Sequence, residues 1–138
     1  MQSTFQTYQL STSALVLAVL FALQSTTSNA EPVGKSTSVR PDAHVNTQML
    51  APGNEVNSND TIRTGNVGVA DLRFNDNSNL SVGPTSDVRL NKFVYDPNKG
   101  SGTAVMEMSR GAFRFVTGSQ SKGNYQLKTP YGTLGVRG

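Results

Sequence analysis

Short apolar runs broken by turn-forming residues are the feature that most restricts how this chain can fold. From Thr47 onward, apolar and polar side chains alternate for a few residues at a time, and Gly, Pro, Asn or Asp ends each run. After the first thirty residues, no stretch keeps the i, i+3, i+4 apolar spacing of an amphipathic helix over ten residues. Turns roughly every 8–12 residues are typical of β architectures. The sequence therefore predicts an all-β fold of about eight to ten short strands, arranged as an antiparallel sandwich or a solenoid-like stack.

Several runs alternate clearly enough to predict which side chains face the core. Successive side chains on a strand point to opposite sides, so apolar residues two positions apart share one face. Phe113 and Phe115 are therefore expected in the core, and Arg114 between them is expected to be exposed. The other groups predicted to share one face are Ala70, Leu72 and Phe74; Val88 and Leu90; Ala104, Met106 and Met108; and Tyr125 and Leu127.

The first thirty residues have the composition of a secretory signal segment. They contain no Asp, Glu, Lys or Arg, and they include the ten-residue apolar run ALVLAVLFAL. A membrane-spanning helix needs roughly 20 apolar residues, whereas about 7–15 suit the core of a signal peptide. Small residues at Ser28 and Ala30 mark a cleavage site before Glu31, so residues 1–30 are predicted to be a cleaved signal peptide. An uncleaved anchor and a misassigned start are the alternatives.

The rest of the chain is expected to be a polar arm followed by one domain. Residues 31–46 are polar and show no period, so they are predicted to be a linker that carries His44 in solvent. Residues 47–138 hold the alternating runs and suffice for a single β domain. The predicted export signal places this domain in the periplasm, at the cell surface or outside the cell.

Basic residues gather near the end of the chain and indicate a partner of opposite charge. Residues 104–138 contain five basic residues and one acidic residue, in a chain of net charge +3. Alternation places Arg114 and Lys128 on exposed faces, where neighbouring strands would form a basic patch beside Tyr131. Arg137 stands beside a glycine, which lets a partner approach the backbone. These four residues are the predicted partner-binding site, for an envelope protein or an anionic envelope polymer.

The residue types that catalysis and metal binding require are scarce. The chain has no cysteine and one histidine, which leaves no material for a thiolate or multi-histidine metal site. The SQSK stretch at Ser119–Lys122 matches the S-x-x-K pattern of serine acyl-enzymes, but it lies in a predicted hairpin loop rather than on the helix that this chemistry needs. The run from Asn75 does not fit a helix–loop–helix calcium site, so Asp76 is interpreted as a turn former. We therefore expect no enzyme, no cofactor and no bound metal.

The order of the motifs resembles the FecR-type domain, the periplasmic part of iron-dicitrate sensor and anti-sigma regulators. TIRTG followed by ADLRFNDNSNLSVGPTSDVRL is similar to the family's I-x-T-G and L-x-F-x-D-G-S-x-L-x-L-G-x-x-S, and TPYGTLGVRG is similar to its closing T-P-x-A-x-x-G-V-R-G-T. FVYDP and RGAFRFVTG resemble a branch found in stand-alone exported proteins. The resemblance covers Gly53 to Gly138, with Asn77 where the family has Gly. The family continues past the position of Gly138, so a natural short form and a fragment are both open.

This resemblance implies two facing sheets of short strands, and binding and signal relay rather than catalysis. Because the apolar run begins near residue 14, we expect a stand-alone exported form without the cytoplasmic anti-sigma region. The alternative is a carbohydrate- or protein-binding adhesion module, in which exposed Tyr125 and Tyr131 near Lys128 stack on sugar or peptide. A small hydrolase is disfavoured by the missing triad. Nucleic acid is not expected as a partner, and the membrane is expected to be met only through the export signal.

Overall fold

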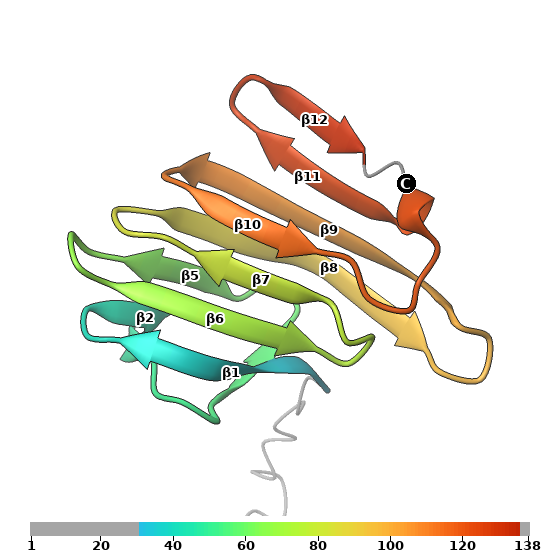
Figure 1. Cartoon of the computed structure of the whole chain (residues 1–138), viewed down its shortest axis with the longest axis horizontal. Helices are drawn as coiled ribbons and strands as arrows, with labels where there is room; N and C mark the ends of the chain where they lie inside the picture. The colour runs from blue at the N-terminus through green and yellow to red at the C-terminus, as the bar shows by residue number, and fades with distance from the viewer. Residues whose placement is uncertain (1–30, 136–138) are drawn as a thin grey trace, which may run out of the picture.

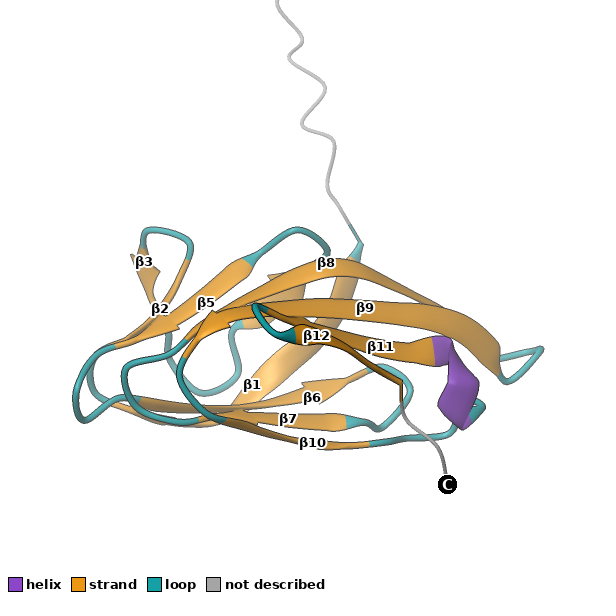
Figure 2. Ribbon diagram, turned by 90° about the horizontal axis from the view of Figure 1, so that it is seen from above, coloured by secondary structure: helices purple, strands orange, loops and turns teal. Residues whose placement is uncertain are grey.

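The computed structural model describes residues 31–135, which form two facing β-sheets (Figures 1 and 2). Sheet A has five strands in the order β10-β7-β6-β1-β4, and sheet B has seven in the order β12-β11-β9-β8-β5-β2-β3. The predicted all-β fold of two facing sheets is confirmed. The predicted signal peptide, residues 1–30, and Arg137 lie outside the described residues.

The strands are short, as the sequence predicts. Those of sheet A are β1 (Pro32–Arg40), β4 (Glu55–Asn57), β6 (Val69–Phe74), β7 (Asn79–Val82) and β10 (Phe113–Val116). Those of sheet B are β2 (Ala43–Val45), β3 (Gln48–Met49), β5 (Thr61–Thr64), β8 (Asp87–Asp96), β9 (Ser101–Arg110), β11 (Tyr125–Thr129) and β12 (Gly132–Gly135). A 3-10 turn, η2 (Lys122–Asn124), precedes β11.

The core lies between the sheets and is built by the alternating runs. Every member of the groups predicted to share one face is buried, apart from the two phenylalanines of β10. The rings of Phe74, on sheet A, and Phe93, on sheet B, stack with their centroids 4.6 Å apart and so join the two layers. In β10, Phe113 and Phe115 are half-buried and pack against the core, while Arg114 is exposed. The predicted facing of β10 is confirmed, and burial is incomplete because β10 is an edge strand.

One strand pairing departs from the antiparallel arrangement. Within the described residues, β9 and β11 run parallel, with Tyr125 opposite Ala104 and Lys128 opposite Glu107. Parallel neighbours need a crossover connection. Here the chain leaves β9, enters sheet A as β10 and returns to sheet B as β11. The SQSK stretch belongs to this crossover, so the hairpin loop predicted for it is wrong.

The linker predicted for residues 31–46 is also wrong. The segment forms β1, which lies between β6 and β4 in sheet A, and β2, in which His44 is half-buried. Its alternation is hidden for two reasons. The inward residue Ser36 is polar and donates a hydrogen bond to the backbone oxygen of Ala51 at 2.5 Å. A register shift between Ser36 and Ser38 then breaks the period of two.

Among residues 31–135, no helix is long and apolar enough to cross a membrane.

Candidate functional site

A surface hollow lies at the carboxyl ends of β9 and β11. Because these two strands are parallel neighbours, their last residues and the turns that follow them lie at the same end of sheet B. The hollow has a volume of about 370 Å³, within the range of roughly 300–1,000 Å³ that is usual for ligand sites. Its lining residues are Met108, Ser109, Arg110, Gly111, Thr129, Pro130 and Tyr131.

A glycine fixes the wall of the hollow that follows β9. Gly111 has a φ of +98°, in the region that side-chain-bearing residues rarely adopt, and a Cβ there would stand 2.0 Å from Oγ of Ser86. The Ser86 hydroxyl accepts a hydrogen bond from the backbone N–H of Ala112 at 3.0 Å. The chain direction after Arg110 is therefore set by close backbone packing.

A threonine fixes the opposite wall. Oγ1 of Thr129 donates to the backbone oxygen of Gly132 at 3.0 Å and accepts a hydrogen bond from the backbone N–H of Tyr131 at 3.3 Å. This small network closes the turn between β11 and β12. The Tyr131 side chain projects from the turn and is 100% exposed, which is unusual for an aromatic ring.

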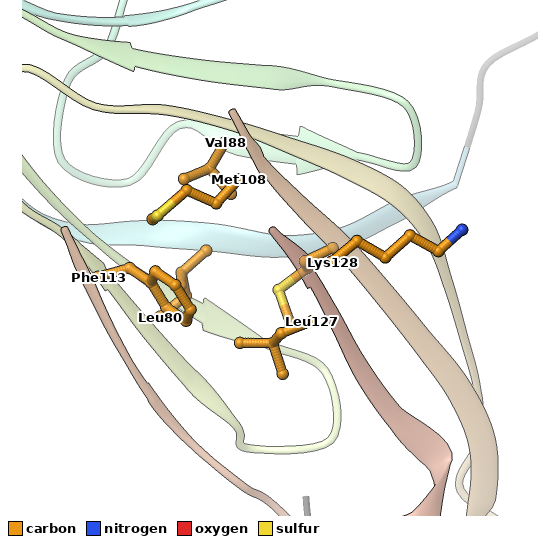
Figure 3. A pocket seen from close by; sticks show the side chains of 7 residues that line it. Leu80, Val88, Met108, Phe113, Leu127 and Lys128 are labelled. Atoms are coloured by element: carbon orange, nitrogen blue, oxygen red, sulfur yellow. The ribbon is translucent and has the colours of Figure 1, made fainter. Parts of the chain in front are cut away.

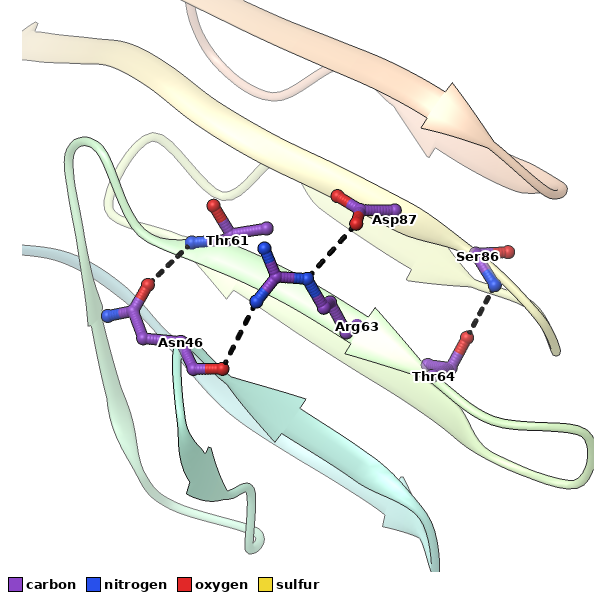
Figure 4. Close-up of polar contacts among 6 residues, drawn as sticks. All are labelled: Asn46, Thr61, Arg63, Thr64, Ser86 and Asp87. Atoms are coloured by element: carbon purple, nitrogen blue, oxygen red, sulfur yellow. Dashed lines mark hydrogen bonds and ion pairs between the residues drawn. The ribbon is translucent and has the colours of Figure 1, made fainter.

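The electrostatics of the hollow favour an anion, because Arg110 is the only charged residue that lines it among residues 31–135. Arg110 stands opposite Asp87 in the strand register. The Asp87 carboxylate is engaged elsewhere, however, since Nε of Arg63 donates to it at 3.1 Å (Figure 4). Within the described residues, Arg110 forms no ion pair. The hollow thus combines a cation, an exposed phenol ring and the apolar Met108, which suits a ligand with a planar or apolar body and a negative charge.

Lys128 lies next to this hollow but points to the outer face of sheet B. It is exposed, whereas its neighbour Leu127 is buried, and Figure 3 shows the lysine side chain extending away from the apolar interior. Its register partner on β9 is Glu107, whose carboxylate accepts a hydrogen bond from Nδ2 of Asn91 at 3.1 Å. Lys128 therefore adds positive charge one residue before the lining residue Thr129.

The predicted patch that joins Arg114 to Lys128 does not form, because the two residues belong to different sheets. Arg114 faces outward from sheet A on β10, and Lys128 faces outward from sheet B on β11. The chain crosses between the layers after β10, which sequence alternation alone does not reveal. Of the predicted site residues, Lys128 lies near the end of β11 and Tyr131 in the turn that follows, Arg114 lies on the other sheet, and Arg137 lies outside the described residues.

Tyr125 is not the exposed stacking residue that the adhesion alternative requires. It is 0% exposed, and its hydroxyl donates a hydrogen bond to Oδ2 of Asp76 at 2.5 Å. Burial, followed by this hydrogen bond, raises the pKa of Tyr125 to about 12. The alternation of Tyr125 with Leu127 is the sequence pattern that indicates its inward facing.

The structure gives Asp76 a larger role than that of a turn former. Its carboxylate is fully buried and accepts hydrogen bonds from the backbone N–H and the hydroxyl of Ser78, from Nε2 of Gln120 and from Tyr125. Its backbone oxygen accepts two more from Ser119. Asp76 therefore ties the β6–β7 turn of sheet A to the crossover and to sheet B. The Asp-x-Ser spacing is typical of an Asx turn but does not predict burial.

Comparison with models of known protein families shows which family the chain belongs to. The family model described as FecR protein matches residues 60–138. The chain belongs to the FecR family. FecR domains are sensing and signalling domains associated with the cell envelope. No curated protein and no solved structure matched the chain.

The FecR match does not span the whole structural unit. It begins at residue 60, after β1, β2, β3 and β4. β1 nevertheless lies in the middle of sheet A, where it pairs with β6 along most of its length. The FecR domain of this chain is therefore completed by strands that precede the family match.

The described residues offer no group of three or more His, Cys, Asp or Glu side chains that could hold a metal ion. Two side chains of the SQSK stretch form structural hydrogen bonds. Oγ of Ser119 donates to the backbone oxygen of Asp76 at 3.0 Å, and Nε2 of Gln120 donates to the Asp76 carboxylate.

Proposed function

We propose that this FecR protein is an exported, non-enzymatic module of the cell envelope that senses an anionic partner through the hollow beside Tyr131. The observation that carries the proposal is the fully exposed Tyr131 ring in a hollow where Arg110 is the one charged residue among those the structure describes. Membership of the FecR family supports a sensing role.

The chemistry of the hollow supports recognition of a carboxylate-bearing surface. A guanidinium binds a carboxylate through two parallel hydrogen bonds, which gives orientation as well as affinity. The Tyr131 ring offers a flat apolar face next to that contact, and exposed Lys128 adds a second cation one residue before the lining residue Thr129. An acidic polysaccharide and an acidic protein segment both present such groups.

Export is supported by the composition of residues 1–30 and by where the fold begins. β1 starts at Pro32, so cleavage between Ala30 and Glu31 would leave the whole strand in the mature protein. Mass spectrometry of the envelope fraction should find an amino terminus at Glu31. A full-length chain recovered from the cytoplasm would refute the export part of the proposal.

Binding to two anionic probes tests the recognition part. Polygalacturonate and polyglutamate carry the same charged group on a sugar ring and on a peptide, and their retention of the purified protein is measured at low and at physiological ionic strength. We expect retention by at least one probe and loss of it as salt rises, because exposed charges are screened over roughly 8–10 Å at physiological salt. Arg110→Glu should abolish retention.

Arg114→Glu is the matched control for this experiment. It introduces the same change of charge on the outer face of sheet A, away from the hollow, and should preserve most of the retention. Equal loss in the two variants would show that binding follows net charge and would refute a site at the hollow.

The adhesion-module alternative is favoured by the same exposed ring. In that case, neutral sugar stacking on Tyr131 supplies the binding, and Tyr131→Ala removes it while Arg110→Glu does not. The two variants together therefore separate the proposed anion site from a carbohydrate-stacking surface.

A further inference from the structure

A second surface lies at the edge where sheet B extends one strand further than sheet A. β10 is the last strand of sheet A and pairs only with β7, so its other edge carries no strand in the described residues. β12 is the last strand of sheet B and pairs with β11. The rings of Phe115 on β10 and Tyr125 on β11 lie 5.2 Å apart, which places β10 across from β11. β12 therefore extends one strand beyond the edge of sheet A (Figure 1).

The inner face of this overhang is apolar, and no residue of 31–135 covers it. Leu127 faces the interior and lines a small apolar space together with Leu80 and Phe113 (Figure 3). Leu134 is directly opposite Leu127 in the register, so it points to the same side of sheet B. Leu134 is nevertheless 55% exposed, because no strand of sheet A lies beneath it. The free edge of β10 and the inner face of β12 thus form two sides of a slot one strand wide.

The edge of β10 carries only part of the usual protection against strand addition. Edge strands are commonly blunted by shortness, by charged side chains, by proline, by a β-bulge or by a charged residue that points inward. β10 is short and carries Arg114, but it has none of the other features. β10 has no proline, pairs with β7 in an unbroken register, and directs its one charge, Arg114, outward. Phe113 and Phe115 remain half-buried beside the vacant strand position.

We propose that this slot binds one extended segment of another polypeptide, which adds a strand to sheet A next to β10. The backbone of the segment would pair with the free edge of β10, and its alternate side chains would pack beside Phe115 and beneath Leu134. The proposal concerns a surface separate from the hollow beside Tyr131 and does not depend on it.

The geometry excludes a second copy of this chain as the occupant. Antiparallel pairing of two β10 edges would place both copies of sheet B on the same side of the joined sheet A. The overhanging β12 of each copy would then occupy the position of β11 in the other. Parallel pairing would turn one copy over, so that its outer face lay under β12 of the other copy. Arg114 of the first copy would then lie beneath the apolar Leu134 of the second, which is unfavourable.

Charge complementarity indicates the kind of segment that fits. Arg114 is exposed at the middle of the β10 edge and forms no ion pair within residues 31–135. Opposite charges directly across two strands stabilise the pairing, whereas like charges oppose it. The segment therefore alternates apolar residues, which face inward, with acidic residues, which face outward beside Arg114.

A labelled peptide tests the slot directly. The probe is a capped nine-residue peptide in which valine alternates with glutamate, and its binding to the purified protein is followed by fluorescence anisotropy. We expect saturable binding that Leu134→Lys weakens by roughly tenfold or more, because it replaces a buried apolar contact with a charge. The control Thr133→Lys adds the same charge on the outer face of the same strand and should change affinity less than about twofold.

Two further readouts make the outcome decisive. Arg114→Glu should reverse the preference, so that a peptide alternating valine with lysine binds more tightly than the glutamate peptide. The peptide should also slow amide hydrogen exchange in Phe113–Val116, as strand pairing requires. Absence of saturable binding by the parent protein, equal affinities of the two lysine variants, or unchanged exchange in β10 would each overturn the proposal. Thermal melts of the three variants confirm that each is folded.

Discussion

The Tyr125 hydroxyl, on sheet B, donates a hydrogen bond to the carboxylate of Asp76, in the β6–β7 turn of sheet A, at 2.5 Å. Both residues are 0% exposed, and the tyrosine oxygen also accepts a hydrogen bond from the backbone N–H of Gly118 at 3.1 Å. One phenol therefore connects the two sheets and the crossover between them.

Replacing that phenol should destabilise the fold. Tyr125→Phe removes a donor from the buried Asp76 carboxylate and an acceptor from Gly118, and should lower the free energy of unfolding by about 1–3 kcal/mol. Tyr95→Phe is the control, because the Tyr95 hydroxyl contacts Oγ of Ser119 in an exposed hydrogen bond. Tyr95→Phe should lower the free energy of unfolding by less than about 0.5 kcal/mol. Urea unfolding measures both, and equal losses would contradict the role of the buried contact.

The same contact predicts a dependence of stability on alkaline pH. The pKa of Tyr125 is raised in the folded protein to about 12, so the folded state keeps its proton while the unfolded chain loses it above pH 10. The contribution of this raised pKa to the free energy of unfolding is fully present below pH 10. It is lost as the pH rises towards 12, at up to about 1.4 kcal/mol per pH unit. Tyr125→Phe should lose stability less steeply than the parent between these values. Identical slopes in urea unfolding at pH 9 to 12 would be inconsistent with this assignment.

A glycine in the crossover should be intolerant of a methyl group. A Cβ on Gly118 would stand 2.0 Å from the backbone oxygen of Asp76 and 2.4 Å from the backbone nitrogen of Ser78, and neither backbone atom can move aside alone. Gly118→Ala should lower the free energy of unfolding by about 1–3 kcal/mol. Gly123→Ala, in the same crossover, meets nothing within 4 Å and should change stability by less than about 0.5 kcal/mol. Thermal unfolding compares the pair, and a tolerated Gly118→Ala would show that the crossover is not clamped on Asp76.

The facing of β10 can be tested by truncating its side chains. Phe115 is half-buried and contacts the Tyr125 ring, so Phe115→Ala should cost about 1–3 kcal/mol, less than the 3–5 kcal/mol of a fully buried ring. Arg114→Ala should change stability by less than about 0.5 kcal/mol, since the residue is exposed and forms no ion pair within the described residues. A larger loss from the arginine variant would reverse the assigned facing.

The sequence predicts the strands of this fold well wherever apolar and polar residues alternate without interruption. The buried positions of β6, β9 and β11 follow from that pattern, because a period of two leaves only one facing for a half-buried strand. In β8 the pattern holds for Val88 and Leu90 but not for Phe93, which is buried after a register shift. The same pattern does not predict β1, because an inward-facing serine and a register shift conceal its period of two.

The layer to which each strand belongs is what alternation cannot predict. Local pattern places Arg114 and Lys128 on exposed faces, which is confirmed, but it does not reveal that the chain changes sheets between them. The hollow is missed for the same reason, since Arg110 and Tyr131 become neighbours only through the parallel pairing of β9 with β11. Non-local pairing, rather than residue preference, decides the site.

Photo-crosslinking in living cells tests the central claim, a partner-binding hollow on an exported FecR domain, most directly. A photoreactive phenylalanine replaces Tyr131 in the hollow or, as the control, Val67, which is 66% exposed and does not line the hollow. After irradiation, we expect an envelope-bound adduct from position 131 that Arg110→Glu suppresses, and none from position 67. No adduct at position 131, or equal adducts at the two positions, would contradict it.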